Sequence, residues 1–147
     1  MSIIDTYSND IYEWDLVVAN KDVNLVSLRE LFITSDGKEL PESIMDNSAT
    51  TISVTRKKDG KPCCLVKFNC YGVYCKTSKD KINWLVNTAA HEATHYALDI
   101  YYSIDSTVCT THQEPFAYLV GWATQCIYNT WTKKKNDTLQ KRKQTKG

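Results

Sequence analysis

Two histidines and a glutamate in the second half of the chain have the types and the spacing to do chemistry. They form the run His91-Glu92-Ala93-Thr94-His95. Four residues make just over one helical turn, so on an α-helix both imidazoles can reach one ion at about 2.0–2.1 Å. The glutamate beside the first histidine could then act as a general base toward a water on that ion. On a helix, this pattern therefore predicts a hydrolytic zinc site.

The segment 78–102 is predicted to form that helix. Thr77 or Ser78 can cap its start. One apolar stripe should pack on a sheet and comprises Ile82, Leu85, Val86, Ala89, Ala93, Ala97 and Ile100. The two histidines fall roughly opposite that stripe, on a face shared with Trp84 and Tyr102.

A catalytic zinc needs a third protein ligand and an open position. The remaining choices are His112 or an acidic side chain. A second helix is predicted to begin here, because Thr111 and Glu114 have capping-box spacing and Pro115 suits a first turn. Its apolar stripe comprises Phe116, Leu119, Val120, Ala123 and Ile127. This helix can fold back against the first one and bring Glu114 toward His95.

The HExxH run, followed by a glutamate on the next helix, resembles the gluzincins, the thermolysin-like zinc metallopeptidases. The resemblance implies that His91, His95 and Glu114 are the zinc ligands and that Glu92 is the general base. It implies a minimal zinc-dependent peptidase that cleaves peptide bonds with a zinc-activated water. The implied fold is α+β and zincin-like, with a small antiparallel sheet, an active-site helix and a second, ligand-bearing helix.

Three further side chains bear on this site. Tyr118 stands where thermolysin-like enzymes place an aspartate that orients a ligand histidine, and Asp99 could substitute for it. His112 could be a ligand in place of Glu114, or a donor to an oxyanion. Tyr118 could also serve as such a donor. We therefore expect His112 and Tyr118, with Glu92, to be the catalytic candidates.

A second reading makes the protein structural. The size of the chain, its many Asn, Lys and Tyr residues, and the pattern HEATHYALD…EPFAYLVGW resemble small zincin-like proteins of bacteriophages. Such a protein could be a virion or tail-connector component whose metal site is structural or degenerate. The expected partners are a peptide or protein substrate, and other phage structural proteins in this second reading.

Composition narrows the remaining function classes. Lys and Arg number 18 and Asp and Glu 17 in 147 residues, so the net charge of +1 argues against a dedicated nucleic-acid binder. No apolar run suits a membrane span or an export signal, which predicts a location in the cytoplasm or a virion. The six cysteines are expected to be free thiols.

Residues 1–132 are predicted to form one domain, followed by a basic, solvated tail over 133–147 that could contact nucleic acid. The pattern predicts a strand over 11–19 and a helix over 24–33 capped by Asn24. Residues 34–50 are predicted to be a loop. The remaining predicted elements are a hairpin of 51–57 and 63–68 around Asp59-Gly60, and a third strand over 71–75.

Overall fold

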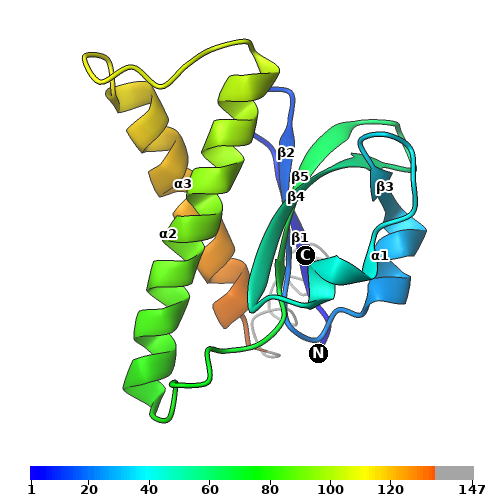
Figure 1. Ribbon diagram of the computed structural model, residues 1–147, viewed down its shortest axis with the longest axis vertical. Helices are drawn as coiled ribbons and strands as arrows, with labels where there is room; N and C mark the ends of the chain where they lie inside the picture. The colour runs from blue at the N-terminus through cyan, green and yellow to red at the C-terminus, as the bar shows by residue number, and fades with distance from the viewer. Residues whose placement is uncertain (135–147) are drawn as a thin grey trace, which may run out of the picture.

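The computed structural model describes residues 1–134. Its elements form three layers, with a central sheet between two long helices on one face and a short helix on the other (Figure 1). The long helices are α2 (Ser78–Ser103) and α3 (Glu114–Thr132), and the short one is α1 (Leu25–Leu31). The architecture is therefore α+β, as the sequence predicts.

The sheet has five strands in the order β1-β2-β5-β4-β3. They are β1 (Ile4–Tyr7), β2 (Asp15–Ala19), β3 (Phe32–Thr34), β4 (Ala49–Arg56) and β5 (Pro62–Phe68). Neighbouring strands are antiparallel except β2 and β5, which are parallel. The expectation of an antiparallel sheet is thus corrected to a mixed one.

The β4–β5 hairpin agrees with the prediction. The chain reverses through Asp59-Gly60, and Gly60 has a φ of +68°, which glycine adopts without the steric cost of a Cβ atom. The third strand predicted over 71–75 is wrong, because that segment is a turn leading to α2. Strands β1 and β3 are additional to the predicted ones, and the predicted loop over 34–50 contains a 3-10 helix, η1 (Glu42–Met45).

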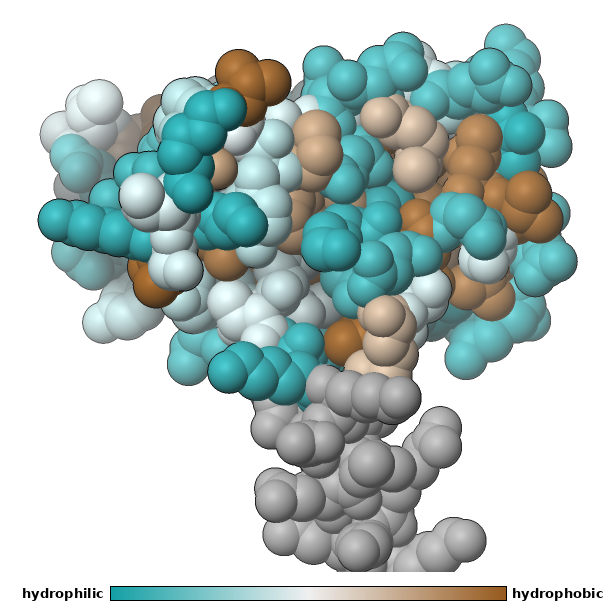
Figure 2. All heavy atoms as spheres, turned by 90° about the horizontal axis from the view of Figure 1, so that it is seen from below, coloured by the Kyte–Doolittle hydropathy of each residue, from teal (hydrophilic) through white to brown (hydrophobic). Residues whose placement is uncertain are grey.

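Side chains of the two central strands alternate between two cores. Leu16 and Val18 of β2 pack toward α2 and α3, whereas Val17 and Ala19 pack toward α1. All five residues of β2 are buried for this reason. The strand predicted over 11–19 is therefore observed only over Asp15–Ala19, the part that helices cover on both faces of the sheet. Figure 2 shows the lower face, where hydrophilic side chains predominate and apolar ones gather on the side of α1.

Helix α2 begins with a complete capping box. The Thr77 hydroxyl accepts from the Asp80 backbone, and the Asp80 carboxylate accepts from the Thr77 backbone. Of the predicted stripe, Leu85, Ala89, Ala93, Ala97 and Ile100 are buried. The other two members, Ile82 and Val86, are about half exposed. Trp84 was expected on the histidine face but is buried against Phe68 and Trp131.

Helix α3 runs back along α2 toward the sheet's lower end (Figure 1). The predicted capping box of Thr111 and Glu114 is wrong: Gln113 is the N-cap and makes no side-chain capping bond. At the other end of α3, Lys133 pairs with Asp5 of β1. The rest of the predicted tail, from residue 135, lies outside the described residues.

Candidate metal centre

His91 and His95 lie one turn apart on the exposed flank of α2, and their rings face each other. Their Nε2 atoms are 3.1 Å apart, and the ring planes are inclined by 76°. Two ligands at 2.0–2.1 Å from one tetrahedral zinc are about 3.3–3.4 Å apart. The two imidazoles therefore fit one zinc ion with an adjustment of a few tenths of an ångström.

Glu92 turns away from this flank toward strand β4. It is only 5% exposed, and its Oε2 accepts a hydrogen bond from the Thr51 hydroxyl at 2.5 Å. One helical step rotates a side chain by about 100°. The carboxylate therefore lies beside the histidines in the groove between α2 and the sheet, where it can receive a proton from a molecule held in front of the rings.

The histidine pair and Glu92 line one hollow of about 340 Å³. Its other lining residues are Asn47, Ala49, Thr50 and Thr51, from the start of β4 and the segment before it. The lining is mostly polar, so the hollow suits a polar group such as a peptide bond. It has the open approach that a catalytic metal site requires.

The edge of β4 next to this hollow carries unpaired backbone groups. The Arg56 N–H donates to Lys61 O on the β5 side. Because the direction of backbone bonds alternates along a strand, Ala49, Thr51 and Ser53 direct their backbone groups away from β5. Strand β3 ends at its pairing with Val54. Within residues 1–134 no strand therefore covers this part of the β4 edge.

The structure does not bring the expected third ligand to the pair. His95 lies eight residues before the end of α2, about 12 Å along the helix axis. Glu114 is the first residue of α3, near that far end, and is exposed. Within the described residues, no three His, Cys, Asp or Glu side chains gather closely enough to hold one metal ion.

His112 and Tyr118 also lie away from the histidine pair. His112 is in the loop between α2 and α3, where its Nδ1 contacts the Thr111 hydroxyl at 3.0 Å and Cys109 Sγ at 3.8 Å. Tyr118 is 75% exposed and lines a different hollow, between α3 and the segment that joins β1 to β2. The sequence-predicted site is therefore assembled only in its His91, Glu92 and His95 part.

Asp99 lies on the same side of α2 as Glu92, and its carboxylate accepts hydrogen bonds from side chains of β4 and β5. Its Oδ2 accepts from the Ser53 hydroxyl at 3.3 Å and from Cys64 Sγ at 3.6 Å. Burial and the nearby Asp99 raise the pKa of the Cys64 thiol. All six cysteines are free, as expected. Asp99 thus anchors α2 to β4 and β5, and no contact with a histidine is present.

Thr51 is the site residue that the sequence analysis missed. Nothing in the sequence pairs a strand threonine with a glutamate 41 positions later, because that contact depends on how α2 crosses β4. The alternation of Ala49, Thr51 and Ser53 on one strand face is the one signal that could have suggested a polar face toward the helix.

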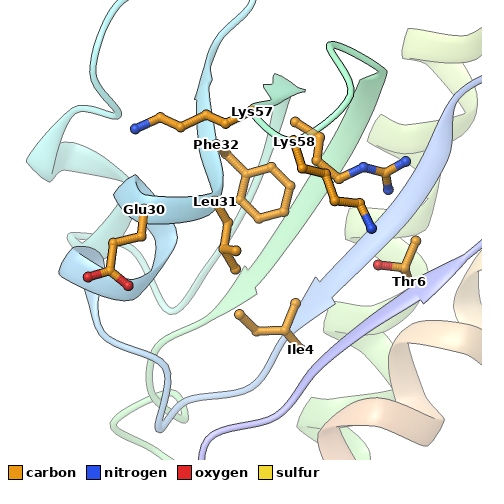
Figure 3. Close-up of a pocket in the computed structure, with 8 residues that line it drawn as sticks. Ile4, Thr6, Glu30, Leu31, Phe32, Lys57 and Lys58 are labelled. Carbon is orange, nitrogen blue, oxygen red and sulfur yellow. The ribbon is translucent and has the colours of Figure 1, made fainter.

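A second hollow, of about 200 Å³, lies on the opposite side of the sheet. Figure 3 shows it between β1, α1 with β3, and the β4–β5 turn. Ile4, Leu31 and Phe32 form its apolar part, and Lys58 lies at its rim. No histidine or cysteine is among its lining residues, so this hollow has no counterpart of the histidine pair on α2.

The helices of the described residues were compared with the requirements of a membrane span, and the chain was compared with known proteins. Among residues 1–134, no helix combines the length and apolarity needed to cross a membrane. Comparison finds no family model, no curated protein and no solved structure that matches the chain.

Proposed function

We propose that the protein is a minimal zinc-dependent peptidase centred on His91, Glu92 and His95. The observation that carries this proposal is the 3.1 Å separation of the two Nε2 atoms beside a buried carboxylate. A hydrogen bond between the two rings accounts for the same distance, so the metal role is favoured by the buried carboxylate and the open, polar hollow beside the pair. When bound, zinc would polarise a peptide carbonyl and make water more acidic.

The side chains of α2 would divide the work between them. His91 and His95 would hold the metal at the open flank. Glu92 would take the proton of the attacking water and pass it to the leaving amine, which is the role of a general base that becomes a general acid. Because Glu92 is buried, bulk water would not compete with the attacking water for its carboxylate.

The open β4 edge favours an extended peptide as the substrate. Ala49, Thr51 and Ser53 offer backbone donors and acceptors in the spacing that an added strand pairs with. A strand bound there would run along the hollow that the histidines line. Its scissile bond would therefore lie in reach of both the metal and Glu92.

Glu114 remains our proposed third ligand, with His112 as the other choice. For either to join the pair, residues 104–113 and the first turn of α3 would have to approach His95. The proposed ligand set therefore belongs to a zinc-loaded state in which this corner of the molecule is rearranged. Replacing Glu114 and His112 one at a time by alanine, with zinc affinity as the readout, tests which of them takes part.

The decisive experiment compares zinc-loaded wild type with Glu92→Gln on a mixture of unstructured peptides. General-base catalysis contributes about 10²–10⁴-fold, so we expect kcat/KM to fall by that factor while the zinc content is unchanged. Glu30→Gln is the matched control, because Glu30 is an exposed glutamate of α1 and lies on the other face of the sheet. A fully loaded wild type that cleaves none of the peptides would contradict the proposal and favour the structural, virion-component reading.

A further inference from the structure

The Glu92 carboxylate has one oxygen held and one oxygen without a partner. Oε2 accepts from the Thr51 hydroxyl at 2.5 Å, and the same hydroxyl lies 3.4 Å from the Glu92 backbone carbonyl. Among the hydrogen bonds of residues 1–134, none involves Oε1. One bond from the strand therefore fixes the carboxylate and leaves its second oxygen available.

Such a bond matters because the terminal torsion of glutamate is soft. The sp³–sp² torsion that turns the carboxylate has broad minima, so burial alone does not orient its oxygens. A proton acceptor must lie within about 2.6–3.2 Å of the proton donor to act as a base. A hydroxyl on the rigid β4 strand can impose that orientation, because β4 pairs with β5 along its whole length.

Thr51 also belongs to the open edge of β4. Its backbone N–H and C=O point away from β5, while its side chain points to α2. A peptide that pairs with this edge would therefore be placed by the same residue that orients the carboxylate. Thr51 would then fix both the register of the bound peptide and the orientation of the Glu92 carboxylate.

We infer that Thr51 is the positioning residue of Glu92, holding Oε2 through its hydroxyl so that Oε1 faces the reacting groups. This inference rests on the proposed function. Thr51 touches neither metal nor reacting atoms, so its effect should appear in kcat rather than in KM or in zinc affinity.

The test uses Thr51→Val, which removes the hydroxyl and keeps the shape, and Thr51→Ser, which keeps the hydroxyl. We expect Thr51→Val to lower kcat by about 10–100-fold, the usual cost of losing a partner that orients a site group, and Thr51→Ser to restore most of it. KM and zinc content should stay within about twofold. Thr55→Val is the matched control, because Thr55 is a half-buried threonine of the same strand that lies outside the hollow and makes no side-chain hydrogen bond within residues 1–134.

A second readout needs no activity and no metal. Unfolding of metal-free wild type, Thr51→Val, Glu92→Ala and the double variant forms a double-mutant cycle. Thr51→Val should reduce the folding equilibrium constant several-fold more when Glu92 is present than when it is absent. Equal effects in both backgrounds would show that the bond contributes nothing and would overturn the inference.

The two readouts separate the possible failures. Coupling in the cycle with an unchanged kcat for Thr51→Val would overturn the positioning role and leave the peptidase proposal standing. An inactive, zinc-loaded wild type would overturn the peptidase proposal and, with it, the catalytic meaning of Thr51. Loss of kcat in both Thr51→Val and Thr51→Ser would point to packing rather than to the hydroxyl, and would also contradict the inference.

Discussion

Lys67 gives the sharpest stability prediction, because the sheet buries its ammonium group and no carboxylate of residues 1–134 pairs with it. The side chain is 0% exposed, and Nζ donates to the backbone oxygens of Asn20 at 2.9 Å and Phe68 at 2.5 Å. Burial lowers the pKa of Lys67 from 10.5 to about 8, and the distant Asp22 charge offsets only part of that effect. The folded protein therefore loses this proton about 2.5 pH units earlier than the unfolded chain.

The sign and size of the pH effect follow from proton linkage. Between pH 8 and 10.5 the unfolded chain binds more protons at Lys67 than the folded protein does, so the free energy of unfolding rises with pH. Each tenfold change in acid constant corresponds to 1.36 kcal/mol, which gives a gain of about 3 kcal/mol across this window. Below pH 8 both states carry the charge, and the full penalty remains.

Urea unfolding of wild type and Lys67→Met between pH 7 and 10.5 measures this gain. The buried cysteines and Tyr96 have raised pKa values, so they lower stability at alkaline pH in both proteins. Subtracting one protein from the other removes their contribution. The stability of wild type relative to Lys67→Met should rise by about 3 kcal/mol. A difference that stays constant within 0.5 kcal/mol, roughly the error of such measurements, would refute the reasoning.

Two shorter predictions concern charged groups elsewhere. Cys109 has a pKa of about 7, lowered by hydrogen bonds to Thr111 and His112, so its alkylation by iodoacetamide should be half-maximal near pH 7. Thr111→Val should move that midpoint upward, and an unchanged midpoint would contradict the assignment. Burial raises the pKa of Asp15, but bonds from Lys61 and Arg56 outweigh it and lower the pKa overall. Asp15→Asn should therefore lower the free energy of unfolding at pH 7 and weaken the stability loss below pH 4, measured by thermal unfolding.

Local sequence signals predicted the helix that carries the two histidines, the cap of α1 and the β4–β5 turn. The spacing of His91 and His95 placed two rings on one helical flank, and Asn24 caps α1 by accepting from the Ser27 N–H. The Asp59-Gly60 turn gave the hairpin. Each of these features depends on a few residues that are close in the sequence, so it can be predicted from the sequence alone.

Long-range pairing explains what the sequence did not predict. The parallel contact of β2 with β5 joins residues about 48 positions apart, and strand β1 is polar enough to resemble a loop. Trp84 is buried because β5 places Phe68 against it. Long-range geometry also separates Glu114 from the histidine pair in this structure, because α2 continues for eight residues beyond His95 before the chain turns toward α3.

Zinc binding is the most direct test of the account. Metal-free wild type, His91→Ala and His95→Ala would be titrated with zinc against a competing chelator of known affinity. We expect one tightly bound zinc for the wild type. Each variant should lose more affinity than the about 10–100-fold that loss of an outer-shell partner costs, because a metal-binding imidazole of the 3.1 Å pair itself is removed. Equal zinc affinity in all three proteins would contradict the proposed metal centre.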